Sequence, residues 1–360
     1  MDSLTQAPGP NEGALRARPL AVLFRRVAAA ALLGALGACG GSGGSTPAPE
    51  PPSPPPVPTP SPTPAPAAPI AAQMTVPTPV GYDADRLAAF NRLNEIRLSA
   101  GLGMLAQNAA MDQAAQAHAE WIIANNSFTH EEAVGTVGFT GAHWWSRDEA
   151  LGYVPTGGGE VLVAGVAAPS GVDELVNTVY HRSAMLAFEP VDIGIGWSSL
   201  VAANVSKPLV IDMTRPGLDT TRGLGQAAQS SIDGVAIWPI DGGRDVPIRL
   251  GSESPNPVPS QDVLTLGTPI SVTVDRMLII SVSAFTLINS ASNVTVPTMT
   301  MTSQNDPNGL VPASFAAAIP LAPLLPNTTY AASISGSMTE SLTGVVMRFD
   351  RNWSFTTATH

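Results

Sequence analysis

The chain has 360 residues, which is long enough for about two domains at roughly 100–200 residues per domain. Its formal net charge is −11 and its few basic residues form no stripe, which argues against nucleic acid and anionic lipid headgroups as partners. The single cysteine excludes an internal disulfide framework, so the stability of the chain must come from its core.

Residues 1–38 are predicted to be a secretion signal. Four arginines between positions 16 and 26 form a positive segment, and the apolar run VAAAALLGALGA follows them. This run is too short to span a bilayer comfortably as a mature helix, which needs about 20 apolar residues. It ends in Leu36-Gly37-Ala38-Cys39, which resembles a bacterial lipobox. The alternative is an ordinary signal peptide followed by an unrelated cysteine.

The lipobox resemblance implies a membrane anchor. It implies cleavage before Cys39, diacylglycerol on its sulfur, and acylation of its nitrogen. We therefore expect a secreted protein of the bacterial cell envelope. Because Gly40 rather than Asp follows the cysteine, the outer membrane is favoured if the cell is Gram-negative.

Residues 39–79 are predicted to be an extended tether. A Gly/Ser stretch gives way to a segment with proline at nearly every second position, a composition typical of polyproline II. At about 3.1 Å per residue, such a tether reaches on the order of 100 Å. It buries no apolar surface and would hold the folded part away from the membrane.

The first folded domain is predicted for residues 80–218, and it begins with two helices. Asp83 or Asp85 can cap the first helix, which stops at Gly101. Asn108 can cap the second, which ends near residues 125–127. Residues 131–159 are rich in glycine and aromatic residues and are expected to be irregular.

The second half of this domain adds strands and one more helix. Glu160 opens an apolar run that fits either a strand or a turn of helix, and Ser170 with Asp173 forms a capping box for a helix leading to His181. VDIGIGWSS and PLVIDMT are β-like, the first by alternation and the second as a short apolar run. Together these elements predict a three-layer α/β/α unit.

The order of the motifs is similar to that of the CAP superfamily, the SCP-like extracellular proteins. The motifs are LNEIR, GLGML, AAQAHAEW, NNSFTH, GFTG, GE, YHRSAML and DIGIGW, spread over roughly residues 84–215. The absence of cysteines from this stretch makes it most similar to the disulfide-free bacterial branch. The resemblance implies an α/β/α CAP sandwich.

Three residues of this stretch match the cavity residues of the family. They are the histidine of the FxH turn, the glutamate of the GEN-like motif and the histidine of the HR motif, here His130, Glu160 and His181. The resemblance implies that they meet at the base of a cleft and can hold a divalent ion, with zinc as the expected cofactor. Two imidazole nitrogens and a carboxylate are ordinary zinc ligands, although their spacing alone is not a recognised metal motif.

Two departures from the family pattern bear on this site. Val179 stands where many members have a second acid, so the nearest acid is Glu174, and Glu131 or Glu132 would have to substitute. The GEN-like motif also reads GEV, so an asparagine that would orient Glu160 is missing.

Three interpretations of the site therefore stay open. It is a metal site, a buried triad in which Glu160 pins both histidine rings, or a catalytic site. A hydrolase would use a metal-bound water with Glu160 as ligand or base. The sequence has no HExxH helix and no GxSxG nucleophile elbow between a strand and a helix, so nucleophilic catalysis has no candidate. His118 is expected to be a packed histidine, and Arg182 to anchor a nearby carboxylate or carbonyl groups.

Residues 261–360 are predicted to form an Ig-like β-sandwich. Runs such as PISVTVD and LIISVSAFTL are separated by Asn, Pro, Gly and Asp. Tyr330 resembles the tyrosine-corner residue of fibronectin- and Ig-like domains, and Trp353 and Phe355 are expected to face the core. Residues 219–260 are either a linker or hold the first strand of this module. The whole chain is thus predicted to be α+β, a CAP sandwich followed by an all-β sandwich.

These expectations favour a non-enzymatic envelope lipoprotein whose CAP cleft binds a lipid, a cell-wall fragment or a peptide. One alternative is a metal-dependent hydrolase of envelope peptide or glycan. The other is an adhesin or scaffold that acts through the Ig-like domain.

Overall fold

A computed structural model describes residues 71–216 and 234–359, and all of these residues fall in one compact unit of the chain. The predictions for the signal peptide, for Cys39 and for most of the tether lie outside the described residues. Within the two described ranges, no helix is both long and apolar enough to cross a membrane.

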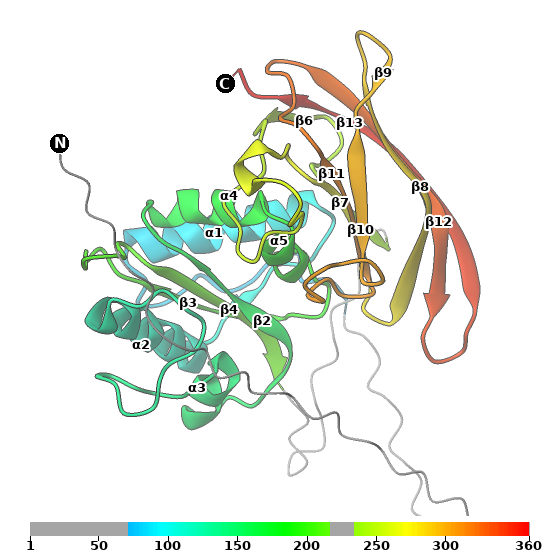
Figure 1. Cartoon of the computed structure of the whole chain (residues 1–360). Helices are drawn as coiled ribbons and strands as arrows, with labels where there is room; N and C mark the ends of the chain where they lie inside the picture. The colour runs from blue at the N-terminus through cyan, green and yellow to red at the C-terminus, as the bar shows by residue number, and fades with distance from the viewer. Residues whose placement is uncertain (1–70, 217–233, 360) are drawn as a thin grey trace, which may run out of the picture. The chain divides into compact units, whose positions relative to one another are not determined.

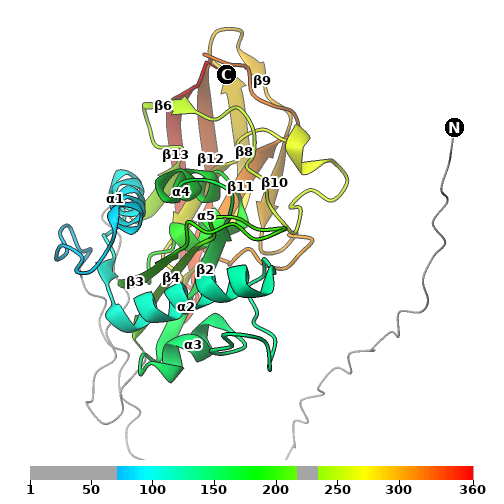
Figure 2. The same cartoon turned by 90° about the vertical axis from the view of Figure 1, so that its left-hand side faces the viewer.

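The first described region is a sheet covered by helices on both faces. Its elements are α1 (Ala84–Ser99), β1 (Ala106–Gln107), α2 (Ala109–Asn125), α3 (Trp144–Ala150), β2 (Pro155–Val163), α4 (Ala168–Val176), α5 (Tyr180–Met185), β3 (Asp192–Trp197) and β4 (Leu209–Pro216). The strand order is β1-β3-β4-β2, with α1 and α4 on one face and α2 and α3 on the other (Figures 1 and 2). The predicted three-layer α/β/α arrangement is confirmed.

The ends of the first two helices follow the sequence signals. The Asp83 side chain accepts a hydrogen bond from the backbone N–H of Arg86 and caps α1, and Gly101 follows the C-cap with a positive φ of 80°. The Asn108 side chain caps α2 in the same way. These caps satisfy backbone groups that the helix itself cannot pair.

Two local predictions about the later elements were wrong. The capping box of Ser170 does not form, because α4 already begins at Ala168 with Pro169 in its first turn, where the fixed φ of proline suits a helix. Asp173 instead accepts a hydrogen bond from Arg92 of α1. The stretch expected to be irregular contains α3, while the run after Glu160 is a strand, the second half of β2.

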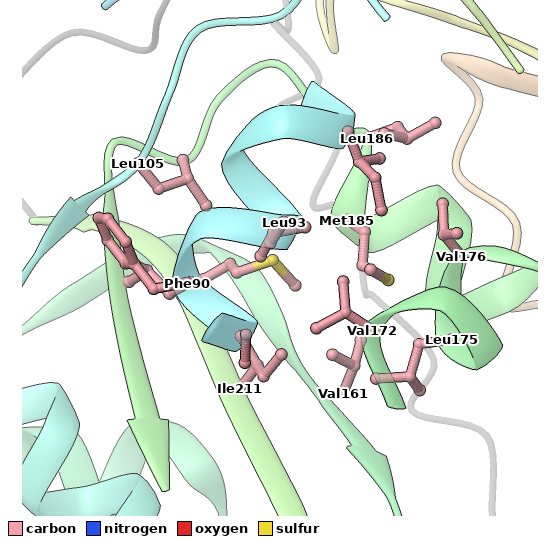
Figure 3. Close-up of a cluster of buried hydrophobic side chains, with 14 of the residues drawn as sticks. Phe90, Leu93, Leu105, Val161, Val172, Leu175, Val176, Met185, Leu186 and Ile211 are labelled. Carbon is pink, nitrogen blue, oxygen red and sulfur yellow. The ribbon is translucent and has the colours of Figure 1, made fainter. Parts of the chain in front are cut away.

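The sheet packs on the helices through an apolar core on one face and a close backbone approach on the other. Figure 3 shows Leu93 of α1 between Met185 and the strand residues Ile211 and Val161, and Phe90 of α1 on the side of Leu105. Their burial removes apolar surface from water and is the main stabilising contribution here.

On the opposite face, the two glycines of the DIGIGW motif allow α2 to lie directly on β3. A Cβ atom at Gly194 would lie 2.3 Å from the backbone of Met111, and one at Gly196 would lie 2.1 Å from the carbonyl oxygen of Ala115. Any side chain at these positions would push α2 away from the sheet.

The second described region consists of two packed β-sheets. Its elements are β5 (Val235–Trp238), β6 (Gly243–Val246), η1 (Val263–Thr265), β7 (Ile270–Val274), β8 (Leu278–Asn289), β9 (Val294–Thr295), β10 (Thr298–Thr302), β11 (Phe315–Pro320), β12 (Thr329–Glu340) and β13 (Val346–Thr357). The strand orders are β10-β11-β7-β5 and β6-β13-β12-β8-β9. The described part of residues 219–260 thus contributes one strand to each sheet.

The core of this β region contains the aromatic residues that the sequence pointed to. Trp353 and Phe355 are buried, so their predicted inward orientation is confirmed. The hydroxyl oxygen of Tyr330 accepts a hydrogen bond from the backbone N–H of Leu325, at 2.8 Å. The all-β prediction is confirmed, while the Ig-like identity of the region stays a prediction.

Candidate functional site

A cavity of about 780 Å³ opens where the loop before α3, the ends of α4 and β2, and the start of α5 meet. Its polar lining includes the imidazoles of His130 and His181 and the carboxyl groups of Glu131 and Glu174. Apolar side chains form part of its surface, and two serines from the chain segment after β6 complete one side. These further residues are Leu162, Val163, Leu175, Val205, Ser252 and Ser254. The two predicted histidines therefore line one cavity, whereas Glu160 lies behind His130.

The ring of His130 is held from within the CAP region. Its Nδ1 lies 2.9 Å from Oε1 of Glu160, and the guanidinium of Arg147 donates to the other carboxylate oxygen. Burial raises the pKa of the Glu160 carboxyl, but the hydrogen bond from His130 and the charge of Arg147 outweigh burial and lower this pKa. An ionised carboxylate only accepts, so Nδ1 of His130 is the donor and its Nε2 is left for the cavity. The ring is 50% exposed.

The ring of His181 is oriented by a different set of partners. The Thr178 hydroxyl donates its single proton to the carbonyl oxygen of Leu175, at 2.7 Å. Its oxygen therefore accepts from Nδ1 of His181, at 3.0 Å, which fixes the proton of a neutral ring on Nδ1. Glu253 Oε1 lies 3.5 Å from the same Nδ1. In the described part of the chain neither histidine has a hydrogen-bond partner at Nε2.

A cluster of buried charged residues lies behind His130, between the sheet, α2 and α3. His118 is fully buried, with Nδ1 3.0 Å from Glu132 and Nε2 3.0 Å from the carbonyl oxygen of Thr129, so it is the packed histidine that was predicted. Burial lowers the pKa of this imidazole. Arg147 also donates to the carbonyl oxygen of His130, at 3.2 Å, which connects the cluster to the loop at the cavity.

Two acids of this cluster have no hydrogen-bond partner among the described residues. They are Asp148 of α3 and Asp212 of β4, and Asp212 is the cross-strand neighbour of Glu160. Burial, which Arg147 opposes and Glu160 reinforces, raises the pKa of Asp148 to about 7. Burial and the charge of Glu160 raise the pKa of Asp212 well above its ordinary value. Burial and the neighbouring carboxylate thus favour the protonated form of Asp212.

Arg182 and Glu174, the other two predicted site residues, have separate roles. Arg182 is fully buried and donates to the carbonyl oxygens of Val176 and Pro269, each at 2.6 Å, so it anchors carbonyl groups as expected. Glu174 lines the cavity, and partial burial raises the pKa of its carboxyl.

Zinc was the cofactor expected at this site, but the three side chains proposed as its ligands are not all free to coordinate a metal ion. Both oxygens of Glu160 are engaged, one by His130 and one by Arg147, so Glu160 would have to give up a partner to reach a metal. Over residues 71–216 and 234–359, no group of three or more His, Cys, Asp or Glu side chains is placed to hold a metal ion. These residues do not fit a three-ligand zinc site as they stand, and zinc stays a prediction.

Several residues of the site escaped the sequence analysis. An acid inside the apolar run of β4 is a usable signal for Asp212, because a charged residue in a buried strand needs a reason. Arg147 was visible only as one arginine of a glycine-rich stretch. Glu253 gave no signal, since it lies outside the predicted domain and reaches the site through the tertiary fold.

The comparisons with known proteins agree with the fold of the first region. Residues 90–200 match the CAP family, described as the Cysteine-rich secretory protein family, so this region is a CAP domain. The β region lies outside the matched residues.

Two solved structures are similar to part of the chain. An outer surface protein from Borrelia burgdorferi is 17% identical over 37% of this chain and 93% of its own, with a TM-score of 0.32. An extracellular protein containing a SCP domain from Bacillus anthracis str. Ames is 20% identical over 35% of this chain and 39% of its own, with a TM-score of 0.30. No curated protein matches the chain.

Proposed function

We propose that this chain is a lipid-anchored protein of the bacterial cell envelope whose CAP cleft binds a neutral or cationic peptide or glycan fragment of the cell wall. The observation that carries the proposal is the pair of imidazoles, each bonded through Nδ1 and each lining the same cavity. Their Nε2 atoms are acceptors for the N–H and O–H groups in which such fragments are rich.

The charge of the lining supports this class of ligand. Glu131 and Glu174 line the cavity, and the described residues that line it include neither Lys nor Arg. Carboxylates attract ammonium groups and accept from hydroxyl and amide groups, whereas they repel phosphate. An anionic lipid is therefore a poorer ligand than a cell-wall fragment, whose methyl groups suit the apolar part of the lining formed by Leu162, Leu175 and Val205.

The state of Glu160 favours binding over hydrolysis. A general base works best when its pKa lies near the working pH. The pKa of Glu160 is lowered by His130 and Arg147 despite burial, and both of its oxygens are occupied. Its contacts suit a residue that orients His130.

The location of the protein is part of the same proposal and rests on the sequence. Cys39 follows a lipobox-like segment and precedes a proline-rich tether, which would carry the CAP cleft away from an anchored lipid. Changing Cys39→Ala should release the chain from the membrane fraction and abolish its labelling by a radioactive fatty acid. Labelling that persists in the variant would contradict the anchor.

The binding proposal is tested by calorimetry on the mature chain from residue 39. The probe is a soluble disaccharide–peptide fragment of peptidoglycan that carries a free amine. We expect one-to-one binding that weakens about tenfold or more in His130→Ala and in His181→Ala, because each loses an acceptor worth about 1.4 kcal/mol or more. Asp350→Asn, a change at an exposed acid of β13 that does not line the cavity, is the control and should bind as the unaltered chain does. Binding that is absent, or equal in all four proteins, would contradict the proposal.

A further inference from the structure

The start of α5, which carries His181, is bonded to a carboxylate from outside the CAP domain. Oε2 of Glu253 accepts from the backbone N–H of Val179, at 2.8 Å, and Oε1 accepts from that of Tyr180, at 2.6 Å. The side chain of Glu253 is fully buried, and the same Oε1 lies 3.5 Å from Nδ1 of His181. One carboxylate thus contacts three successive residues around the cavity histidine.

The segment that carries Glu253 runs closely along the CAP domain. The side-chain amide of Asn177 donates to the carbonyl oxygen of Arg249, at 2.7 Å, and the backbone N–H of Gly251 donates to that of Asn177, at 3.0 Å. A Cβ atom at Gly251 would lie 3.0 Å from the carbonyl oxygen of Glu174 and 3.1 Å from Cγ2 of Thr178. This approach depends on glycine, and it places Ser252 and Ser254 in the cavity lining.

The β region also holds α5 from its other sides. The Tyr180 hydroxyl donates to the Asp306 carboxylate, at 2.7 Å, and Arg182 donates to the carbonyl oxygen of Pro269. Val179 and Tyr180 are buried in one apolar cluster with Phe315 and other residues of the β region. α5 is therefore held by the β region as well as by the CAP domain.

We infer that the β region completes the CAP cleft, and that Glu253 is a positioning residue for His181. It brings a carboxylate from the neighbouring region to the start of α5, where Val179 is buried and apolar. Its carboxylate fixes the start of α5 and, together with the Thr178 hydroxyl, lies next to Nδ1 of His181. Ser252 and Ser254 offer hydroxyl groups to the ligand. The serine contacts rest on the proposed function, whereas the positioning of His181 does not need a ligand.

The positioning role is tested by long-range ¹H–¹⁵N NMR on the mature chain labelled at its histidines. The full sequence holds five histidines, so the imidazole signals can be assigned with single variants. We expect Glu253→Gln and Glu253→Ala to change the imidazole ¹⁵N shifts of His181, through mixed tautomers or exchange broadening. The signals of His130 should stay unchanged, because Glu160 and not Glu253 holds that ring.

Asp306→Asn is the matched control. It removes a carboxylate that contacts the Tyr180 hydroxyl but not His181, so the His181 signals should stay as they are. Should neither Glu253 variant fold, Gly251→Ala displaces the same segment more mildly, and we expect it to shift the His181 signals. Unchanged His181 signals in every folded variant among these three would overturn the inference.

A second measurement separates this inference from the proposed function. The peptidoglycan fragment should bind Glu253→Ala about tenfold more weakly than the unaltered chain, while Asp306→Asn keeps its affinity. If the unaltered chain does not bind the fragment, the proposed function fails while the NMR result still decides the role of Glu253. If the fragment binds but the His181 signals are the same in the Glu253 variants as in the unaltered chain, the proposed function stands and the inference fails.

Discussion

The two histidines of the cavity are held in different ways. His130 is fixed by Glu160 and Arg147, which belong to the same CAP domain. His181 lies next to Glu253, and its helix is bonded to the β region. The half of the cleft around His130 is therefore formed by CAP residues alone. The half around His181 also depends on the β region, which lies outside the residues that match the family. Variants that disturb one half and spare the other test this division.

The largest effect is expected from Arg147→Ala on the His130 half. This guanidinium is fully buried between Glu160 and backbone carbonyl groups, so its removal leaves one oxygen of the buried Glu160 carboxylate without a partner. We expect a loss of about 3–5 kcal/mol in the free energy of unfolding, measured with urea. Arg92→Ala, which breaks a half-exposed pair with Asp173, should cost less than about 1 kcal/mol. Equal losses of unfolding free energy in the two variants would mean that the buried Arg147–Glu160 pair stabilises the fold no more than the half-exposed Arg92–Asp173 pair.

The protonated acids behind His130 should make stability fall as the pH rises. Burial raises the pKa of Asp148 to about 7 and that of Asp212 well above its ordinary value. At these two acids the folded chain then binds more protons than the unfolded chain above about pH 4, so their contribution to the free energy of unfolding falls from there through the folded-state pKa values.

Asp212→Asn removes one of these titrating groups. The variant should be more stable than the unaltered chain by about 1–2 kcal/mol at pH 8, with a shallower slope between pH 5 and 8. The control is Asp350→Asn, a change at an exposed acid that should leave the slope as it is. Urea unfolding at several pH values measures both, and a slope in Asp212→Asn equal to that of the unaltered chain would refute the protonated state.

Zinc affinity provides a further comparison of the His130 half and the His181 half of the cleft. Any zinc that binds in the cleft needs both imidazoles, so its affinity should fall about tenfold or more in His130→Ala and in His181→Ala. Calorimetric titration of the mature chain measures this, with Asp350→Asn, at an exposed acid outside the cavity, as the control. Zinc binding that survives both cavity variants would place the metal elsewhere.

The smallest effect is expected on the His181 half, from Tyr180→Phe. The variant loses the hydrogen bond to Asp306 and the one from Asn308 but keeps the ring in its apolar cluster. We expect a loss of about 1–2 kcal/mol in the free energy of unfolding. Tyr153→Phe, which loses a hydrogen bond to Asp192 within the CAP domain, is the control and should cost about 1 kcal/mol. A shift of the His130 signals in Tyr180→Phe would break the division between the two halves.

Much of the CAP fold was predictable because its signals are local. Asn108 caps its helix through its own side chain, and Gly194 and Gly196 sit where α2 lies on the sheet. The capping box of Ser170 failed because Pro169, one residue away, starts the helix earlier. Competing local signals of this kind cannot be ranked from the pattern alone.

The site was predictable only in part. The motifs identified His130, Glu160 and His181, and the first two are in direct contact. The contacts that decide what these residues can do are long-range. Asp212 is paired with Glu160 on the neighbouring strand, and Glu253 bonds to Val179 from the β region. Neither pairing has a fixed spacing in the sequence.

The most direct test of the account is the tautomer of both cavity histidines in the unaltered mature chain. Long-range ¹H–¹⁵N NMR at about pH 8, where an ordinary imidazole is neutral, distinguishes a proton on Nδ1 from one on Nε2. The account predicts that His130 and His181 both carry the proton on Nδ1, and that the peptidoglycan fragment shifts the Nε2 signals of both. A proton on Nε2 of either ring would contradict the account, because that atom could then not accept a hydrogen bond from a ligand. An Nε2 signal that does not change when the fragment is added would contradict it as well.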